Sequence, residues 1–344
     1  MFLSFLNQYR GAALAAGFVG LALCSCDSSF IYDDLPPCIP EYKVRLLYTY
    51  NMQNVNRVDQ VEAAEVYAFD SDGNLSASVK ADRQTLIDNA WTLPLELERS
   101  KKYDIIVWAG LTDDSPFSLD GYRSFASKED LTCRLNTKID EEGSITSDMV
   151  FPPLFHGATS VKYEVEDGQE VYEAPLIKNT NTIDVIVRKS NGEPVEEDYY
   201  FVEMTDANGV MDCANNVSGD NIQYHHASFA SEQLPLPDGE GDLQSQTSEA
   251  GRWQFHTARL MKDSSARLKI SLGHSNINLI DTGLIDLLLA SKAYEAPYMD
   301  DQEYLDRQDS YSLDFKLRVD EKWAVVEIYV NDWLVVVNDV EWKK

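Results

Sequence analysis

The chain has 344 residues, with 29 Lys and Arg against 58 Asp and Glu, and a formal net charge of −29. The acidic residues are scattered along the chain, which predicts a self-repelling, solubilising surface and argues against nucleic acid as a partner, because phosphates need a basic patch. The length exceeds that of one ordinary domain and suggests two.

Residues 1–25 have the organisation of an export signal. Arg10 precedes an uncharged apolar stretch that has the length of a signal-peptide core and is too short for a comfortable transmembrane span. The order Leu-x-Ser-Cys that follows resembles the lipobox of bacterial lipoproteins, and it predicts that Cys26 is acylated and becomes the first mature residue. Cys24 is the weaker candidate, because a bulky Leu precedes it. An ordinary signal peptide cut nearby, or an uncleaved anchor helix, are the alternatives.

Residues 26–41 are expected to form an acidic tether between this lipid site and the first strand. Pro36, Pro37 and Pro40 remove backbone donors and oppose a helix. No Lys or Arg occurs in residues 26–42. The first cation is Lys43, which already lies inside the first predicted strand.

Residues 42–160 are predicted to form an N-terminal β-sandwich domain. Short runs of alternating or continuous apolar residues are separated by turn residues, as is typical of sandwich strands; they lie at 43–52, 65–70, 75–79, 92–98, 103–109 and 130–135. Asp72-Gly73 favours a tight hairpin. The segment 70–74 also resembles the start of a calcium loop, but Ala81 stands where that loop needs a bidentate Glu, so the hairpin is preferred.

Residues 161–344 are predicted to form a second β-sandwich with one or two short helices. Residues 282–290 have a broad apolar face that indicates a helix, and residues 301–308 indicate a second helical turn. Residues 215–250 are rich in Asn, Ser, Gly, Asp and Gln and are predicted to form a long loop. The whole chain is therefore assigned to the all-β class.

The last predicted strand carries apolar side chains on both faces. Its turn is Asn331-Asp332, and its core is formed by Trp333, Leu334, Val335, Val336 and Val337. Side chains alternate between the faces of a strand, so this strand must be buried on both sides or must find a partner. It either closes its own domain or is donated to another subunit, whose pockets would take the alternate side chains.

No pattern in the chain indicates catalysis, a cofactor or a metal. The five histidines have no zinc-ligand or metalloprotease spacing, and there is no phosphate-binding Gly-rich loop and no Gly-x-Ser-x-Gly elbow. His156 is expected to be a packed or capping residue, whereas His225 and His226 could bind a metal adventitiously. Cys38, Cys133 and Cys213 have no metal-ligand spacing; a bridge that involves Cys38 and no bridge at all both stay open.

Segments spread along most of the chain resemble the FimB/Mfa2 family of fimbrial anchor lipoproteins from Bacteroidetes. They are CDSSFIYDDLPPC (26–38), RLLYTYNM (45–52), EVYAFDSDGNL (65–75), YDIIVWAGL (103–111), LFHG (154–157), KNTNTIDVIV (178–187), TARLM (257–261), DDQEYLDRQDSYSLDFKL (300–317) and VNDWLVVVN (330–338). The resemblance implies two tandem transthyretin-like β-sandwich domains, no enzymatic activity and a place at the base of a fimbrium in the outer membrane. It also implies shaft subunits as partners.

The same resemblance bears on the position of the chain within a fimbrium. Shaft subunits of such systems are trimmed after Arg or Lys by a trypsin-like protease, and residues 26–42 contain neither. We therefore expect a lipid-anchored outer-membrane subunit that joins the shaft through residues 333–337, with no small-molecule substrate. The alternative is a surface lipoprotein that binds glycan or host protein, including a fimbrial tip adhesin. For that alternative, Tyr224, Phe229 and Trp253 border the predicted loop without forming a clear platform.

Overall fold

The computed structural model describes residues 41–98, 101–120, 127–147, 149–161, 171–219, 221–236, 247–273, 277–318 and 324–337. These residues belong to one compact unit, Pro40–Lys344. Cys26, Cys38 and the predicted tether lie outside the described residues, so their assignments stay predictions.

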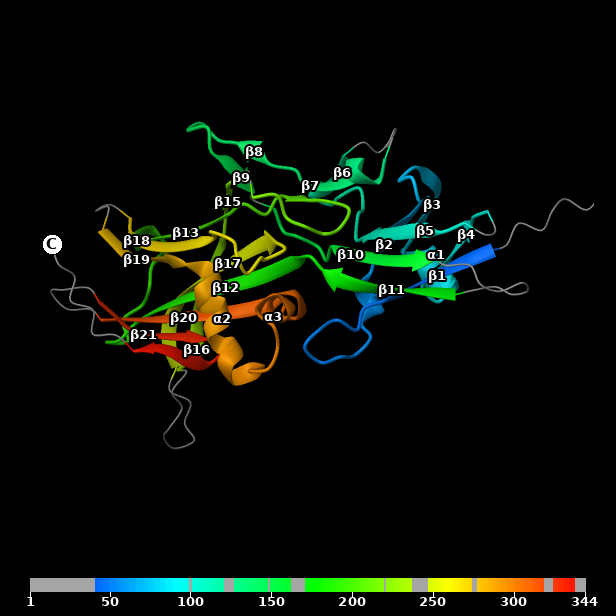
Figure 1. Cartoon of the computed structure of the whole chain (residues 1–344). Helices are drawn as coiled ribbons and strands as arrows, with labels where there is room; N and C mark the ends of the chain where they lie inside the picture. Colours follow the sequence, from blue (N-terminus) through cyan, green and yellow to red (C-terminus); the bar gives the residue numbers. More distant parts are fainter. Residues whose placement is uncertain are drawn as a thin grey trace, which may run out of the picture. The chain divides into compact units, whose positions relative to one another are not determined.

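Seven strands form a first sheet in the order β3-β2-β5-β10-β11-β1-β4 (Figure 1). Their bounds are β1 (Glu41–Leu47), β2 (Ala63–Phe69), β3 (Leu75–Asp82), β4 (Thr92–Glu96), β5 (Tyr103–Ala109), β10 (Phe155–Val161) and β11 (Val171–Lys178). All neighbours are antiparallel except β1 and β11. The edge strands β3 and β4 approach each other, so the sheet curls over its own inner face.

The alternation of side chains along β5 explains how this sheet is covered on both faces. Tyr103, Ile105 and Val107 join a buried cluster with the inner residues of β1 and β4. Ile106 and Trp108 point the other way, into a second cluster beneath a small sheet in the order β14-β7-β6. Because both faces are buried, the strand is a nearly continuous apolar run. The small sheet consists of β6 (Phe117–Asp120), β7 (Thr132–Leu135) and β14 (Val210–Met211).

Two six-stranded sheets form the second sandwich. One has the order β16-β17-β12-β20-β21-β22, with β12 (Thr180–Lys189), β16 (Ser228–Pro235), β17 (Thr247–Ala258), β20 (Ser310–Arg318), β21 (Ala324–Val330) and β22 (Trp333–Val337). The other has the order β19-β18-β13-β15-β9-β8, with β8 (Lys138–Ile139), β9 (Ile145–Ser147), β13 (Tyr200–Asp206), β15 (Gln223–His225), β18 (Arg267–Leu272) and β19 (Ile277–Gly283). Inward side chains of both sheets share one buried cluster, which we call the second core.

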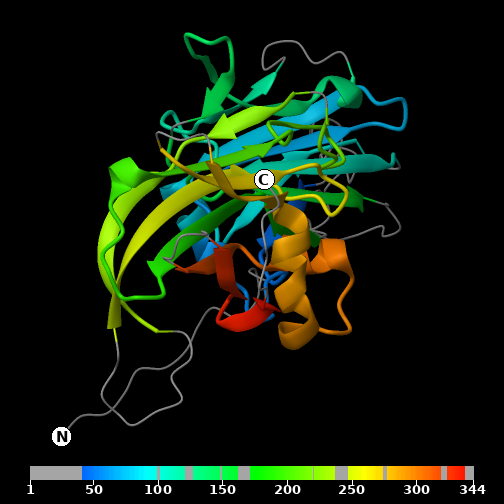
Figure 2. The same ribbon diagram turned by 90° about the vertical axis from the view of Figure 1, so that its left-hand side faces the viewer.

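Short helices accompany both parts of the chain. α1 (Arg83–Asp88) begins at Asp82, whose carboxylate accepts a hydrogen bond from the Thr85 backbone, as an N-cap should. α2 (Leu284–Glu295) and α3 (Asp301–Arg307) contribute apolar side chains to the second core, and Figure 2 shows α2 beside the red strands β21 and β22. Three 3-10 turns are Val58–Gln60, Lys128–Asp130 and Glu197–Tyr199.

The predicted all-β class with two sandwiches and two short helices in the second is confirmed. Helix α1 in the first sandwich was not expected. The predicted loop 215–250 is wrong, because it contains β15, β16 and the start of β17. Strand β16 could not be predicted from an apolar pattern. It is an edge strand, and all its residues are exposed or half-buried, so its sequence has no apolar face.

The boundary between residues 160 and 161 stays a prediction. The strand pairings place β11 (171–178) beside β10 and β1 of the first sheet, and the chain enters the second sandwich with β12 at Thr180. Two strand pairings also cross between the sequence blocks: β9 pairs with β15, and β14 pairs with β7.

Candidate functional site

The hairpin β21–β22 holds the predicted contact strand at the edge of a six-stranded sheet. Asn331 and Asp332 form its turn with φ values of 48° and 67°, which match the two-residue turn that the sequence predicts. The Asn331 backbone N–H donates to the Ser312 carbonyl at 2.8 Å, and the Asn331 side-chain oxygen accepts from the Ser312 N–H at 3.0 Å. The turn is therefore fastened to β20.

The exposure of β22 changes along the strand, and its first two residues are the most exposed. Trp333 and Leu334 are 43% and 40% exposed, whereas Val335 and Val336 are half-buried and pack against the second core. Val337 pairs with Glu327 across the ladder, and the surroundings of its side chain lie outside what the structure describes. Within the described chain, β22 thus belongs to its own sheet but leaves large apolar side chains exposed.

A stacked aromatic pair joins β22 to helix α2. The rings of Tyr294 and Trp333 lie 4.9 Å apart between centroids and 6° from parallel, and both side chains are about half exposed. Tyr298, just beyond α2, is fully exposed. The stacked rings of Tyr294 and Trp333 form a partly exposed aromatic patch, which is the kind of surface that marks contact with another molecule.

The ladder between β21 and β22 is interrupted at Val335. Tyr329 pairs with Leu334 and Ile328 pairs with Val336, so Val335 is the extra residue of a β-bulge. A bulge breaks regular hydrogen bonding and twists an edge strand. We therefore expect β22 to be held less firmly than a regular strand in the interior of the sheet.

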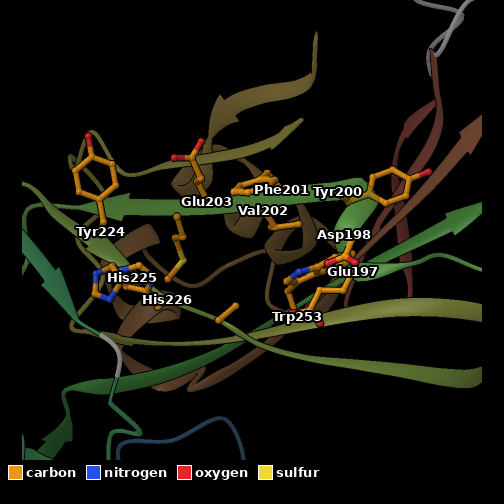
Figure 3. Close-up of a pocket in the computed structure, with 12 residues that line it drawn as sticks. Glu197, Asp198, Tyr200, Phe201, Val202, Glu203, Tyr224, His225, His226 and Trp253 are labelled. Carbon is orange, nitrogen blue, oxygen red and sulfur yellow. The ribbon is translucent and has the colours of Figure 1, made fainter. Parts of the chain in front are cut away.

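A pocket of about 430 Å³ opens beside β13 (Figure 3). Figure 3 shows Tyr224, His225 and His226 at one end and Asp198 and Trp253 at the other. Its lining is aromatic and acidic and consists of Glu197, Asp198, Tyr200, Phe201, Val202, Glu203, Met204, Tyr224, His225, His226, Ala227 and Trp253. Two aromatic residues that bordered the predicted loop, Tyr224 and Trp253, therefore share one pocket, while Phe229 packs on the Trp253 ring at 5.0 Å between centroids.

His156 and His225 behave as packing residues. Burial lowers the pKa of His156 to about 4; its Nε2 lies 3.0 Å from the Cys213 carbonyl, and its ring meets Trp108 edge to face. Burial also lowers the pKa of His225 to about 4, so its imidazole is neutral at physiological pH. No group of three or more His, Cys, Asp or Glu in the described part of the chain is arranged to hold a metal ion.

Cys133 and Cys213 are free thiols that contact the same buried cluster. Burial raises the pKa of the Cys133 thiol, which makes it unreactive at neutral pH. The structure therefore assigns packing, rather than nucleophilic chemistry, to Cys133.

Helix α3 forms a joint between distant parts of the sequence. Arg307 donates to the Asn51 carbonyl at 3.2 Å and to Asn54 Oδ1 at 2.9 Å, and its guanidinium lies 4.0 Å from the centre of the Tyr50 ring. The segments 45–52 and 300–317 resemble a known family, but their sequence alone indicates no role for them. Their contact shows that they hold the loop after β1 against the second sandwich.

The architecture is that of a tandem β-sandwich protein. A family model described as fimbrillin-A associated anchor proteins Mfa1 and Mfa2 matches residues 35–339, and the chain belongs to that family. The chain is 24% identical to the minor fimbrium anchoring subunit Mfa2 of Porphyromonas gingivalis, with 96% of this chain and 94% of that protein covered.

Several solved structures have the same fold. The fimbrial anchor protein Mfa2 from Porphyromonas gingivalis superimposes with a TM-score of 0.67 at 19% identity, over 88% of this chain and all of that one. A protein described as an adhesin from Bacteroides thetaiotaomicron gives a TM-score of 0.73 at 25% identity, over 89% of this chain and all of that one. A protein from the same organism, described as polysaccharide-binding, gives 0.72 at 24% identity, over 87% and 99%.

Membership of this family makes the chain a fimbrial anchor protein that associates with fimbrial subunits at the cell surface. The family is a structural one and is not a known enzyme family. Across the described helices, none has both the length and the apolar character needed to span a membrane. The sequence failed to predict the pocket, the α2 aromatic patch and the α3 joint, because each joins residues far apart in the chain. No local pattern links Tyr294 with Trp333, the two residues that form the patch.

Proposed function

We propose that this chain anchors a fimbrium to the outer membrane through lipid on Cys26 and joins the adjacent shaft subunit by donating strand β22. The observation that carries the proposal is the exposed apolar edge strand β22 in a chain of the anchor family. The cation-free segment 26–42 supports permanent tethering, because a trypsin-like protease has no site there. Strand β1 also supports permanent tethering. It is hydrogen-bonded to β11 on one side and to β4 on the other, so it stays part of the first sheet.

Strand donation is favoured because β22 makes few interactions with its own domain. It has one neighbouring strand, a bulge at Val335 and two exposed apolar side chains, so its release costs less than release of an interior strand such as β12. Burial of each large apolar side chain in a partner groove contributes about 1.5–3 kcal/mol. Together with a full backbone ladder, this offsets the loss of the β21 contacts and gives a long-lived joint.

Val335→Asp together with Val337→Asp tests the donation. Asp in a partner's apolar groove would bury unpaired charge, so fimbriae should detach into the medium while the protein still folds. Leu234→Asp is the matched control, because it places Asp at a half-buried position on β16, the opposite edge of the same sheet.

Two measurements decide the outcome: thermal melting of the purified variants, and fimbriae recovered from cells against medium. A double variant that folds and keeps its fimbriae attached would falsify strand donation. A double variant that melts far below the control identifies β22 as an indispensable part of its own core.

The lipid tether has a separate test. Cys26→Ala should move the protein from the membrane fraction to the soluble fraction, whereas Cys24→Ala should leave it attached. Several acyl chains on one residue give stable anchoring at about 0.8 kcal/mol per buried methylene. A Cys26→Ala protein that still sediments with membranes rules out acylation at this residue.

A second candidate function, a surface adhesin that binds glycan, is favoured by the aromatic and acidic pocket beside β13. Aromatic faces pack on sugar rings while carboxylates accept hydrogen bonds from hydroxyls. Tyr224→Ala and Phe201→Ala remove exposed rings without opening the core. Glycan-array binding by the wild type that both variants lose would support this function; no binding by the wild type would exclude the pocket as a glycan site.

A further inference from the structure

A second pocket, of about 350 Å³, lies where β13 ends. Three connections meet there: the turn after β13, the segment that ends at Gly219, and the connection between β17 and β18. Its lining consists of Asp206, Ala207, Asn208, Val217, Gly219, Met261, Asp263, Ser264 and Ser265. None of these side chains is basic, and two are carboxylates, so the lining suits a cation and disfavours an anion.

Buried oxygens without a donor mark this pocket as more than an acidic surface. Asp206 is 3% exposed; its Oδ1 accepts from the Ala207 N–H at 2.7 Å and from the Ser264 hydroxyl, but its Oδ2 has no hydrogen-bond partner among the described residues. Burial raises the pKa of this carboxyl, which reflects the cost of leaving the charge unmatched.

Asn208 also has a buried side-chain oxygen without a hydrogen-bond donor. It is 1% exposed, and its amide nitrogen faces three acceptors: Thr257 Oγ1 at 2.8 Å and the carbonyls of Ala258 and Arg259 at 3.1 and 3.3 Å. These acceptors fix the orientation of the amide, so Oδ1 points away from them, and no described residue donates to it. Gln223, the cross-strand partner of Asp206, has an unpaired Oε1 as well.

We propose that this pocket binds a calcium ion through Asp206, Asn208 and Asp263, with Ser264 and water as further oxygen ligands. Calcium takes six to eight oxygen ligands from carboxylates, amide oxygens and water in a flexible geometry, and a pocket of this volume holds the ion with several waters. Magnesium fits less well, because it demands a near-ideal octahedron. The net charge of −29 draws divalent cations to the surface. A bound ion would cross-link the three connections.

Calorimetric titration of the EDTA-treated full chain with calcium chloride tests the proposal. We expect one saturable site, with a dissociation constant on the order of 10⁻⁴–10⁻³ M, as in extracellular calcium modules. We also expect a higher melting temperature in calcium than in EDTA, and a smaller rise in magnesium chloride. Asp206→Asn and Asp263→Asn should each weaken binding at least tenfold.

Asp263 is exposed, so Asp263→Asn should fold normally, and Asp206→Asn keeps one acceptor oxygen while it removes the charge. Asp72→Asn is the matched control, because it removes a carboxylate from the exposed β2–β3 turn. Binding that falls equally in all three variants means that the acidic surface binds calcium non-specifically. The absence of saturable binding to the wild type means that the pocket holds water. Either result overturns the proposal.

Discussion

At the scale of single residues, the segment LFHG shows why a short sequence can mark a fold without marking a site. Leu154 and Phe155 are buried in different clusters, and the Phe155 ring packs edge to face on Tyr48 at 4.9 Å. Gly157 lies against β11: a Cβ there would come within 2.7 Å of a Leu176 methyl group and 3.0 Å of the Pro175 carbonyl. Packing fixes each of these positions. From the sequence, a packing role was expected for His156 alone.

His156 should make stability depend on pH. Its pKa is about 4 in the folded chain and near 6.5 when exposed, so the unfolded state binds more protons between these values. The contribution to stability is therefore complete above about pH 6.5 and is lost as the pH falls toward 4. At pH 5 the loss is on the order of 2 kcal/mol.

His156→Gln keeps a donor for the Cys213 carbonyl and removes the titration. Urea unfolding at pH 7.5 and pH 5.0 should show a smaller loss of stability for this variant than for the wild type. His225 and the carboxylates titrate in both proteins, so the difference between the two isolates His156. Equal losses would show that His156 is protonated without penalty in the fold.

At the scale of elements, local pattern predicted several of the strands that bury at least one face and the two helices of the second sandwich. The YDIIVWA run became β5, the Asp72-Gly73 turn became the β2–β3 hairpin, and the segment 301–308 became α3. Local pattern failed for β16, which has no buried face, and for the pairing of β9 with β15, since no sequence period encodes a partner far along the chain. The terminal strand was found, but its bulge was not.

Helix α3 carries the next prediction. Arg307→Ala removes both hydrogen bonds to the loop after β1 and the contact with the Tyr50 ring. Hydrogen bonds from a charged donor contribute about 1.5–3 kcal/mol, so local opening of residues 49–57 should become at least tenfold more frequent. Hydrogen exchange measured by mass spectrometry would report that opening.

Arg307→Lys is the matched control for this experiment. Lys keeps the charge but loses the planar fork, so its protection should lie between that of the wild type and that of Arg307→Ala. Unchanged exchange over residues 49–57 in both variants would mean that α3 does not hold this loop. Faster exchange throughout the second sandwich would instead show that Arg307 supports the sandwich itself.

At the scale of the whole molecule, the sequence predicted the class of fold but not how the two sequence blocks interlock. Alternating strands and turns define sandwiches, whereas strands β8, β9 and β14 each join a sheet built mainly from the other block. These exchanges, together with the α3 joint, tie the blocks together by backbone pairing. Such ties suit the proposed role of a subunit that transmits force between a membrane and a fibre, because several hydrogen-bonded ladders share the load.

The last prediction concerns the attachment of the whole chain. Trypsin added to membranes that carry the protein should not cut after Lys43 or Arg45, because both residues lie in β1, which is hydrogen-bonded to β11 and β4. A protease needs a locally unfolded segment, and β1 is buried in the first sandwich. The wild type should therefore release no fragment that begins at Val44 or Leu46.

Asp34→Arg places a trypsin site in the predicted tether. This variant should release a fragment that begins at Leu35 and contains both sandwiches, whereas Asp34→Ala, which removes the same charge without creating a site, should not. Mass spectrometry of the supernatant identifies the first residue of each fragment. Release of wild-type fragments that begin at Val44 would show that β1 opens readily, and the argument for an uncleavable anchor would fail. Resistance of Asp34→Arg would place residue 34 within protected structure instead of a tether.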